Sequence, residues 1–113
     1  MARKNTLTSS PPYPVEQAIK LLGKNLRIAR LRRNLTIEEV AGKIGTGSRA
    51  VMDAEKGKIA TGIVVYTALL WAYDLIGPME GLADPASDEE GLALSMTRER
   101  ARLKDDEGLD NDF

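Results

Sequence analysis

The sequence contains no cysteine and no histidine among its 113 residues. Without cysteine there is no disulfide, no zinc–thiolate cluster and no thiol nucleophile. Without histidine there is no Ser-His-Asp triad and no imidazole metal site, and the commonest general base near neutral pH is missing. With one tryptophan, three tyrosines and one phenylalanine, the chain also offers little surface for stacking single-stranded bases.

Acidic residues do not supply an alternative catalytic centre. In a helix, the adjacent pairs Glu38-Glu39 and Glu89-Glu90 would point about 100° apart, so neither pair can converge as an acid–base dyad. We therefore expect no enzymatic activity, no metal and no cofactor.

Long hydrophobic runs are also missing. The longest uncharged stretch, residues 59–73, has 15 residues and contains Gly62, whereas a membrane span needs about 18–20 predominantly apolar residues. No apolar run of a secretory signal follows the basic start of the chain. We expect a soluble, cytoplasmic protein that does not bind a membrane.

The net charge of −1 conceals an uneven distribution along the chain. Residues 1–58 carry 12 lysines and arginines against 5 acidic residues, a balance of +7, and residues 59–113 carry 4 against 12, a balance of −8. Such asymmetry between halves indicates a nucleic acid or a charged protein as partner.

Apolar residues recur at helical spacing through most of the chain. The β-branched run at 63–65 has no second strand-like segment to pair with, so the sequence predicts an all-α fold. The expected helices cover residues 15–34, 36–45, 48–56, 61–75 and 78–82. The fourth of them is apolar nearly all round, and we expect it to be buried.

Both ends of the chain lie outside these helices. Residues 1–14 are polar and proline-containing and are expected to form a flexible arm. Residues 15–85 would form the compact domain. The acidic tail, residues 86–113, has too few large apolar residues to build a core. We expect it to be disordered or ordered on a partner, although a helix over 87–103 is also compatible with the sequence.

Local signals define the two short helices at the centre of the chain. Thr36 and Glu39 have the spacing of a capping box, which begins a helix. Gly45 and Gly57 follow the two helices at the place where a C-terminal glycine permits a positive φ. Two short helices joined by a tight turn and preceded by a long basic helix are typical of a helix-turn-helix.

The segment 35–58 carries a more specific pattern. After the threonine cap come a small Ala41, the turn residue Gly45 and an ending Glu55-x-Gly57. Together with the first expected helix, this segment resembles the Cro/phage-repressor family, also called XRE.

The resemblance covers roughly residues 22–76. It implies a compact five-helix, lambda-repressor-like DNA-binding domain in which the second expected helix crosses the phosphate backbone. The third would enter the major groove, which is about 12 Å wide and admits one helix. A plain helical bundle with a short turn is the alternative.

In members of this family the residues entering the groove correspond to Ser48, Arg49, Met52 and Asp53. Arg49 suits either a bidentate contact to guanine or a phosphate contact. Asp53 departs from the expected chemistry, because an acidic residue repels phosphates unless it accepts a hydrogen bond from cytosine or pairs with Arg49.

Ile37 is a second departure, since the family usually has a polar residue there to hold a backbone phosphate. Phosphate contacts can still come from Thr36, Lys56 and Lys58. These departures predict modest DNA affinity for a monomer, with dimerisation needed for a useful site.

The resemblance also implies a partly buried ion pair between Arg30 and Glu55, linking the first and third helices. Its role would be structural. The remaining basic residues of the first helix are expected to form a mostly solvated face, with one or two of them reaching DNA: Lys20, Lys24, Arg27, Arg32 and Arg33.

The apolar residues that follow exceed what one small core can bury. In the family this region commonly forms a two-fold dimer interface, for which the candidates are Trp71, Leu75, Ile76, Met79 and Leu82. A homodimer would place two recognition helices about 34 Å apart to read a palindromic operator. The alternative is that all of these residues belong to the core.

The stretches Thr61–Ala72 and Leu82–Leu94 resemble small regulators of the HipB type, which accompany HipA-like kinase toxins. This resemblance implies an antitoxin that represses its own promoter and binds the toxin. A protein-interaction module with weak or no DNA binding is the alternative, favoured by Asp53 and Ile37.

Overall fold

The computed structural model describes residues 6–111, with side chains up to residue 106, and this part of the chain is helical without any strand. The all-α prediction is confirmed. The chain divides into two units, with the boundary between Gly77 and Pro78, ahead of the boundary at residue 85 that the sequence indicated.

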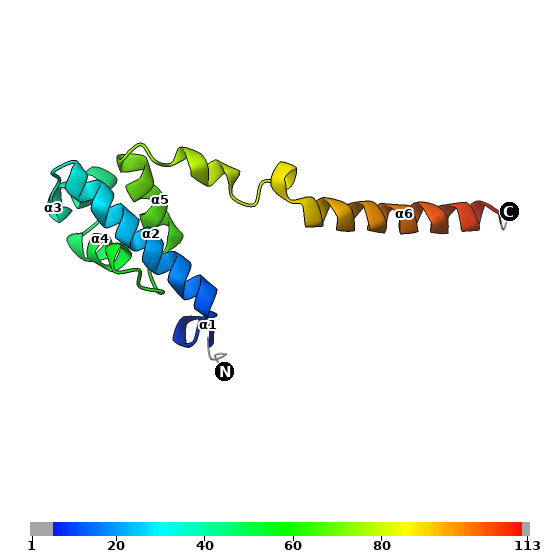
Figure 1. Ribbon diagram of the computed structural model, residues 1–113, viewed down its shortest axis with the longest axis horizontal. Coiled ribbons are helices and arrows are strands. Elements are labelled where there is room, and N and C mark those ends of the chain that lie inside the picture. Colours follow the sequence, from blue (N-terminus) through cyan, green and yellow to red (C-terminus); the bar gives the residue numbers. More distant parts are fainter. Residues whose placement is uncertain (1–5, 112–113) are drawn as a thin grey trace. The chain divides into compact units, whose positions relative to one another are not determined.

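The first unit contains five α-helices within the described residues (Figure 1). They are α1 (Thr6–Ser9), α2 (Tyr13–Arg32), α3 (Ile37–Ile44), α4 (Ser48–Glu55) and α5 (Ile63–Ala72). The short helix α1 lies within the expected flexible arm, whose first five residues are outside the described part. Helix α2 begins at Tyr13, ahead of the predicted start, with Pro14 in its first turn, where a missing amide proton costs nothing.

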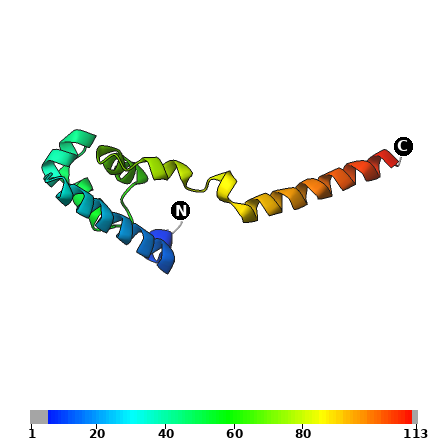
Figure 2. The ribbon, with the colours of Figure 1, turned by 45° about the horizontal axis from the view of Figure 1, so that its top comes forward.

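Four of these helices share one apolar core. The largest fully buried side chains come from every one of them and from the residue after α5: Leu26, Val40, Val51, Leu69 and Tyr73. Helix α4 packs against α2, α3 and α5, and Figures 1 and 2 show it beside α2. This packing fixes one face of α4 and leaves the other face outward.

The predicted signals around α3 are confirmed. The Glu39 amide donates to the Thr36 hydroxyl at 3.1 Å, and the Thr36 amide donates to the Glu39 carboxylate at 3.2 Å, which completes the capping box. Gly45 ends the helix with φ +82°, and its amide donates to the Ala41 carbonyl. The chain then turns directly into α4.

The expectation that the fourth helix is buried all round is wrong. Helix α5 is shorter than predicted, because Asp74 adopts a φ of +58° and ends the helical path. Ile63 and Val64 are about 70% exposed, and Trp71 is 54% exposed. The cause is one-sided packing: α2, α3 and α4 pack against α5 and leave these three side chains largely open, with Lys43 Nζ 5.9 Å from the centroid of the Trp71 ring. No helix among residues 6–111 combines the length and apolarity of a membrane span.

The second unit consists of short helical turns followed by one long helix. The segment Gly77–Gly81, which begins at the last residue of the first unit, is a 3₁₀ helix, η1, where an α-helix was expected, and Pro85–Ser87 forms a second, η2. Helix α6 (Glu89–Asn111) is longer than the 87–103 helix that the sequence allowed. Asp88 caps its start by accepting from the Gly91 amide. None of its side chains up to residue 106 is buried. The stability of this helix therefore comes from local helix propensity.

Two glycines permit close contact between α2 and the end of α4. A Cβ at Gly23 would collide with the carbonyl oxygen of Ala54 and lie 2.9 Å from the Glu55 carbonyl oxygen and the Gly57 amide nitrogen. Gly57 has φ +67° and faces the backbone of Lys20 in the same way. The backbones of the two helices are in direct contact here, so no side chain can move to make room for an added methyl group.

We predict that Gly23→Ala lowers the free energy of unfolding by about 1–3 kcal/mol, because the helices must separate to admit the methyl group. Gly42→Ala is the matched control: a Cβ at Gly42, inside α3, would meet nothing within 4 Å. It should raise stability by about 0.5–1 kcal/mol through helix propensity. Urea denaturation measures both, and equal effects of the two variants would contradict the packing described.

Candidate nucleic-acid interface

Helices α3 and α4 form the candidate interface together with the turn between them. The turn contains Gly45 and ends at Gly47, which precedes α4 in an extended conformation without a side-chain cap. Val51 and Ala54 fix the inner face of α4 in the core. The outer face therefore has a defined orientation relative to α3.

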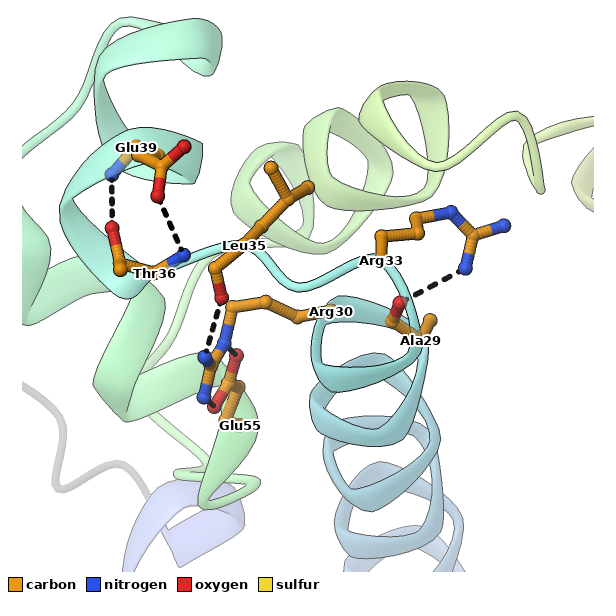
Figure 3. Close-up of polar contacts among 7 residues, drawn as sticks. All are labelled: Ala29, Arg30, Arg33, Leu35, Thr36, Glu39 and Glu55. Atoms are coloured by element: carbon orange, nitrogen blue, oxygen red, sulfur yellow. Dashed lines mark hydrogen bonds and ion pairs between the residues drawn. The ribbon is translucent and has the colours of Figure 1, made fainter.

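The ion pair implied by the resemblance is present and is drawn in Figure 3. Arg30 Nε donates to Glu55 Oε2 at 2.7 Å, and Arg30 Nη2 donates to Glu55 Oε1 at 3.0 Å. Arg30 Nη1 donates to the Leu35 carbonyl oxygen at 2.9 Å. The two side chains are 9% and 6% exposed. The hydrogen bond to Glu55 raises the pKa of Arg30 above its ordinary value, so this guanidinium remains charged.

The four predicted base-facing residues differ in exposure. Arg49 is the most open, with 78% of its side chain exposed, and Ser48, Met52 and Asp53 are half-buried. Helical spacing places Arg49, Met52 and Asp53 on one face of α4. Arg49 is therefore the member of this set that extends furthest into solvent.

Asp53 is neutralised by two cations. Its Oδ1 lies 3.1 Å from Lys58 Nζ and 3.6 Å from Arg49 Nε, although neither contact has hydrogen-bond geometry. The pairing with Arg49 is one of the two arrangements that the sequence left open. The pair with Lys58 was not foreseen, because it depends on the turn after α4 bringing that lysine back.

The predicted phosphate-facing residues also differ from one another. The Thr36 hydroxyl accepts a hydrogen bond from the Glu39 amide within the capping box, and Lys58 forms an ion pair with Asp53. Lys56 is exposed and makes no ion pair with any described residue. Lys56 is therefore the predicted phosphate contact whose charge is not paired with any described residue.

A groove runs between α2, α3 and α4, with a volume of about 410 Å³. Its lining residues come from all three helices and the turn after α4: Arg27, Arg30, Ile37, Met52, Glu55 and Lys56. Arg27, expected among the mostly solvated basic residues of the first helix, is exposed and lines this groove. Its position could have been predicted from the sequence, because Arg27 lies three residues before Arg30 and residues three apart are neighbours on a helix.

Arg33, also expected among these mostly solvated residues, is exposed, but its guanidinium is engaged within the chain. Its guanidinium donates to the Ala29 and Tyr73 carbonyl oxygens at 2.9 and 3.0 Å and lies 5.4 Å from the centroid of the Tyr73 ring. Lys43 donates to the Ala72 carbonyl oxygen at 3.3 Å. These cations satisfy carbonyl groups at the end of α5, where a basic side chain is favourable.

Two tyrosines are buried in the first unit. Burial raises the pKa of both Tyr66 and Tyr73 above the usual value near 10, so both phenols are neutral at physiological pH. The Tyr66 hydroxyl donates to the Lys58 carbonyl oxygen at 3.4 Å, which connects α5 to the turn after α4.

The dimer candidates are divided between the two units. Trp71, Leu75 and Ile76 lie in the first unit and are 54%, 42% and 37% exposed. Met79 and Leu82 lie in the second unit, where Met79 is half-buried and Leu82 is exposed. The first three are therefore not core residues of their unit.

No family model, no curated protein and no solved structure matches this chain. Among the residues whose positions are described, no group of three or more acidic, cysteine or histidine side chains is placed to hold a metal ion.

We predict that Glu55→Ala lowers the free energy of unfolding by about 3–5 kcal/mol, because Arg30 would remain as a buried charge without its partner. The control is Glu16→Ala, which removes an exposed pair with Lys20 and should cost less than about 1 kcal/mol. Thermal denaturation of both variants tests the difference, and a small loss for Glu55→Ala would show that the buried pair does not hold the helices together.

Proposed function

We propose that this protein is a sequence-specific double-stranded DNA-binding transcriptional repressor that acts as a homodimer. The observation that carries the proposal is the α3–turn–α4 unit, with its cap, left-handed glycine and buried Arg30–Glu55 pair. These features support a helix α4 held in a fixed orientation with Arg49 outward. The net positive charge of residues 1–58 would attract the phosphates of DNA.

In this proposal α4 enters the major groove. Arg49 reads a guanine, a contact worth about 1–3 kcal/mol of discrimination when bidentate. Ser48 and Met52 lie against neighbouring base edges or methyl groups. Asp53 does not repel DNA, because Lys58 and Arg49 offset its charge. Lys56 contacts the backbone.

Dimerisation is the second part of the proposal. The exposed residues Trp71, Leu75 and Ile76 form a candidate interface in the first unit, since large apolar residues left in water favour association. A two-fold dimer would present two copies of α4 to a palindromic operator, about 34 Å apart.

We further propose that the protein is the antitoxin and autorepressor of a toxin–antitoxin pair with a HipA-like kinase toxin. The support is the resemblance of the stretches 61–72 and 82–94 to HipB-type regulators. Helix α6, whose side chains up to residue 106 are unburied, supplies free surface for a partner. A gene for such a kinase beside the gene for this chain would support the pairing.

The test is fluorescence anisotropy of the full chain with the DNA upstream of its own gene, against a scrambled duplex, at two salt concentrations. We expect preferential binding that weakens with salt, at two protomers per site. Arg49→Glu should abolish the preference for the upstream duplex. The control is Glu99→Gln, which changes the charge of an exposed residue in α6 and should leave the preference unchanged. Equal, weak binding to both duplexes, even at low salt, would favour the protein-interaction module.

A further inference from the structure

The groove between α2, α3 and α4 contains two kinds of charged residue. Arg30 and Glu55 form its buried part, where their charges cancel and each of the three guanidinium nitrogens of Arg30 donates a hydrogen bond. Arg27 and Lys56 are exposed, and neither makes an ion pair with any residue that the structure describes. The lining therefore has a net charge of +2 from two unengaged cations.

We propose that Arg27 and Lys56 form a binding site for a backbone phosphate diester of double-stranded DNA. Two unpaired cations on one groove repel each other, and an anion between them removes that cost. A guanidinium and an ammonium are also the donors that bind phosphate best. Ile37, on the α3 side of the groove, has no side-chain donor, so Arg27 and Lys56 supply the donors for the anion.

The position of the groove beside α4 favours a DNA phosphate as the anion. Met52, on the outward face of α4, and Lys56, the residue that follows the helix, both line the groove. If α4 lies in the major groove, this site meets the flanking phosphate backbone. The inference rests on the proposed function and adds a positioning contact from α2, a helix outside the helix-turn-helix. Such a contact strengthens binding to every sequence alike.

The experiment compares Arg27→Gln with Arg32→Gln, which removes the same charge from an exposed position of α2 outside the groove. Anisotropy is measured with the upstream duplex and the scrambled duplex over a series of salt concentrations. Arg27→Gln should weaken binding to both duplexes by about three- to tenfold and reduce the salt slope by about 1. The ratio between the two duplexes should not change.

The remaining outcomes separate this inference from the proposed function. Lys56→Gln should reproduce the effect of Arg27→Gln, and a thermal midpoint equal to that of the unchanged protein verifies that each variant is folded. If the unchanged protein prefers its upstream DNA and Arg27→Gln behaves like Arg32→Gln, the phosphate site is wrong and the repressor proposal stands. If the unchanged protein binds neither duplex, both are wrong.

Discussion

The buried pair between Arg30 and Glu55 is the interaction on which the arrangement of the first unit depends. The Arg30 guanidinium donates to the Glu55 carboxylate and to the Leu35 carbonyl oxygen (Figure 3). One side chain on α2 therefore holds the end of α4 and the residue before the cap of α3. A buried charge is tolerated because it is paired and hydrogen-bonded. The close contact at Gly23 brings the two helices near enough for the pair to form.

The cations of the first unit perform two different tasks. Arg30, Arg33 and Lys43 are engaged with a carboxylate or with carbonyl oxygens of the same chain, and so stabilise the fold. Arg27 and Lys56 have no ion pair among the described residues and remain available to an anion. A count of basic residues in the sequence cannot make this distinction, since it depends on which helices meet in the folded chain.

The sequence was sufficient for features with a local cause. Thr36, Glu39 and Gly45 specify the start and end of α3 through contacts within a few residues, and the structure has them as predicted. Resemblance alone implied the Arg30–Glu55 pair, which spans 25 residues. The sequence did not predict that α5 is buried on one side only. The sequence of an apolar helix does not show how many neighbouring helices cover it. Nor could the sequence show that Arg33 reaches the end of α5, because that contact depends on how α2 and α5 pack.

We propose above all that DNA meets the outward face of α4 and the start of α3. The most direct measurement is a nitrogen–proton NMR titration of the full chain with the duplex upstream of its gene. We expect the largest chemical-shift changes on the amides of residues 36–39 and 47–58, and little change on those of α6. Changes confined to α6, or to the exposed side of α5, would contradict this proposal.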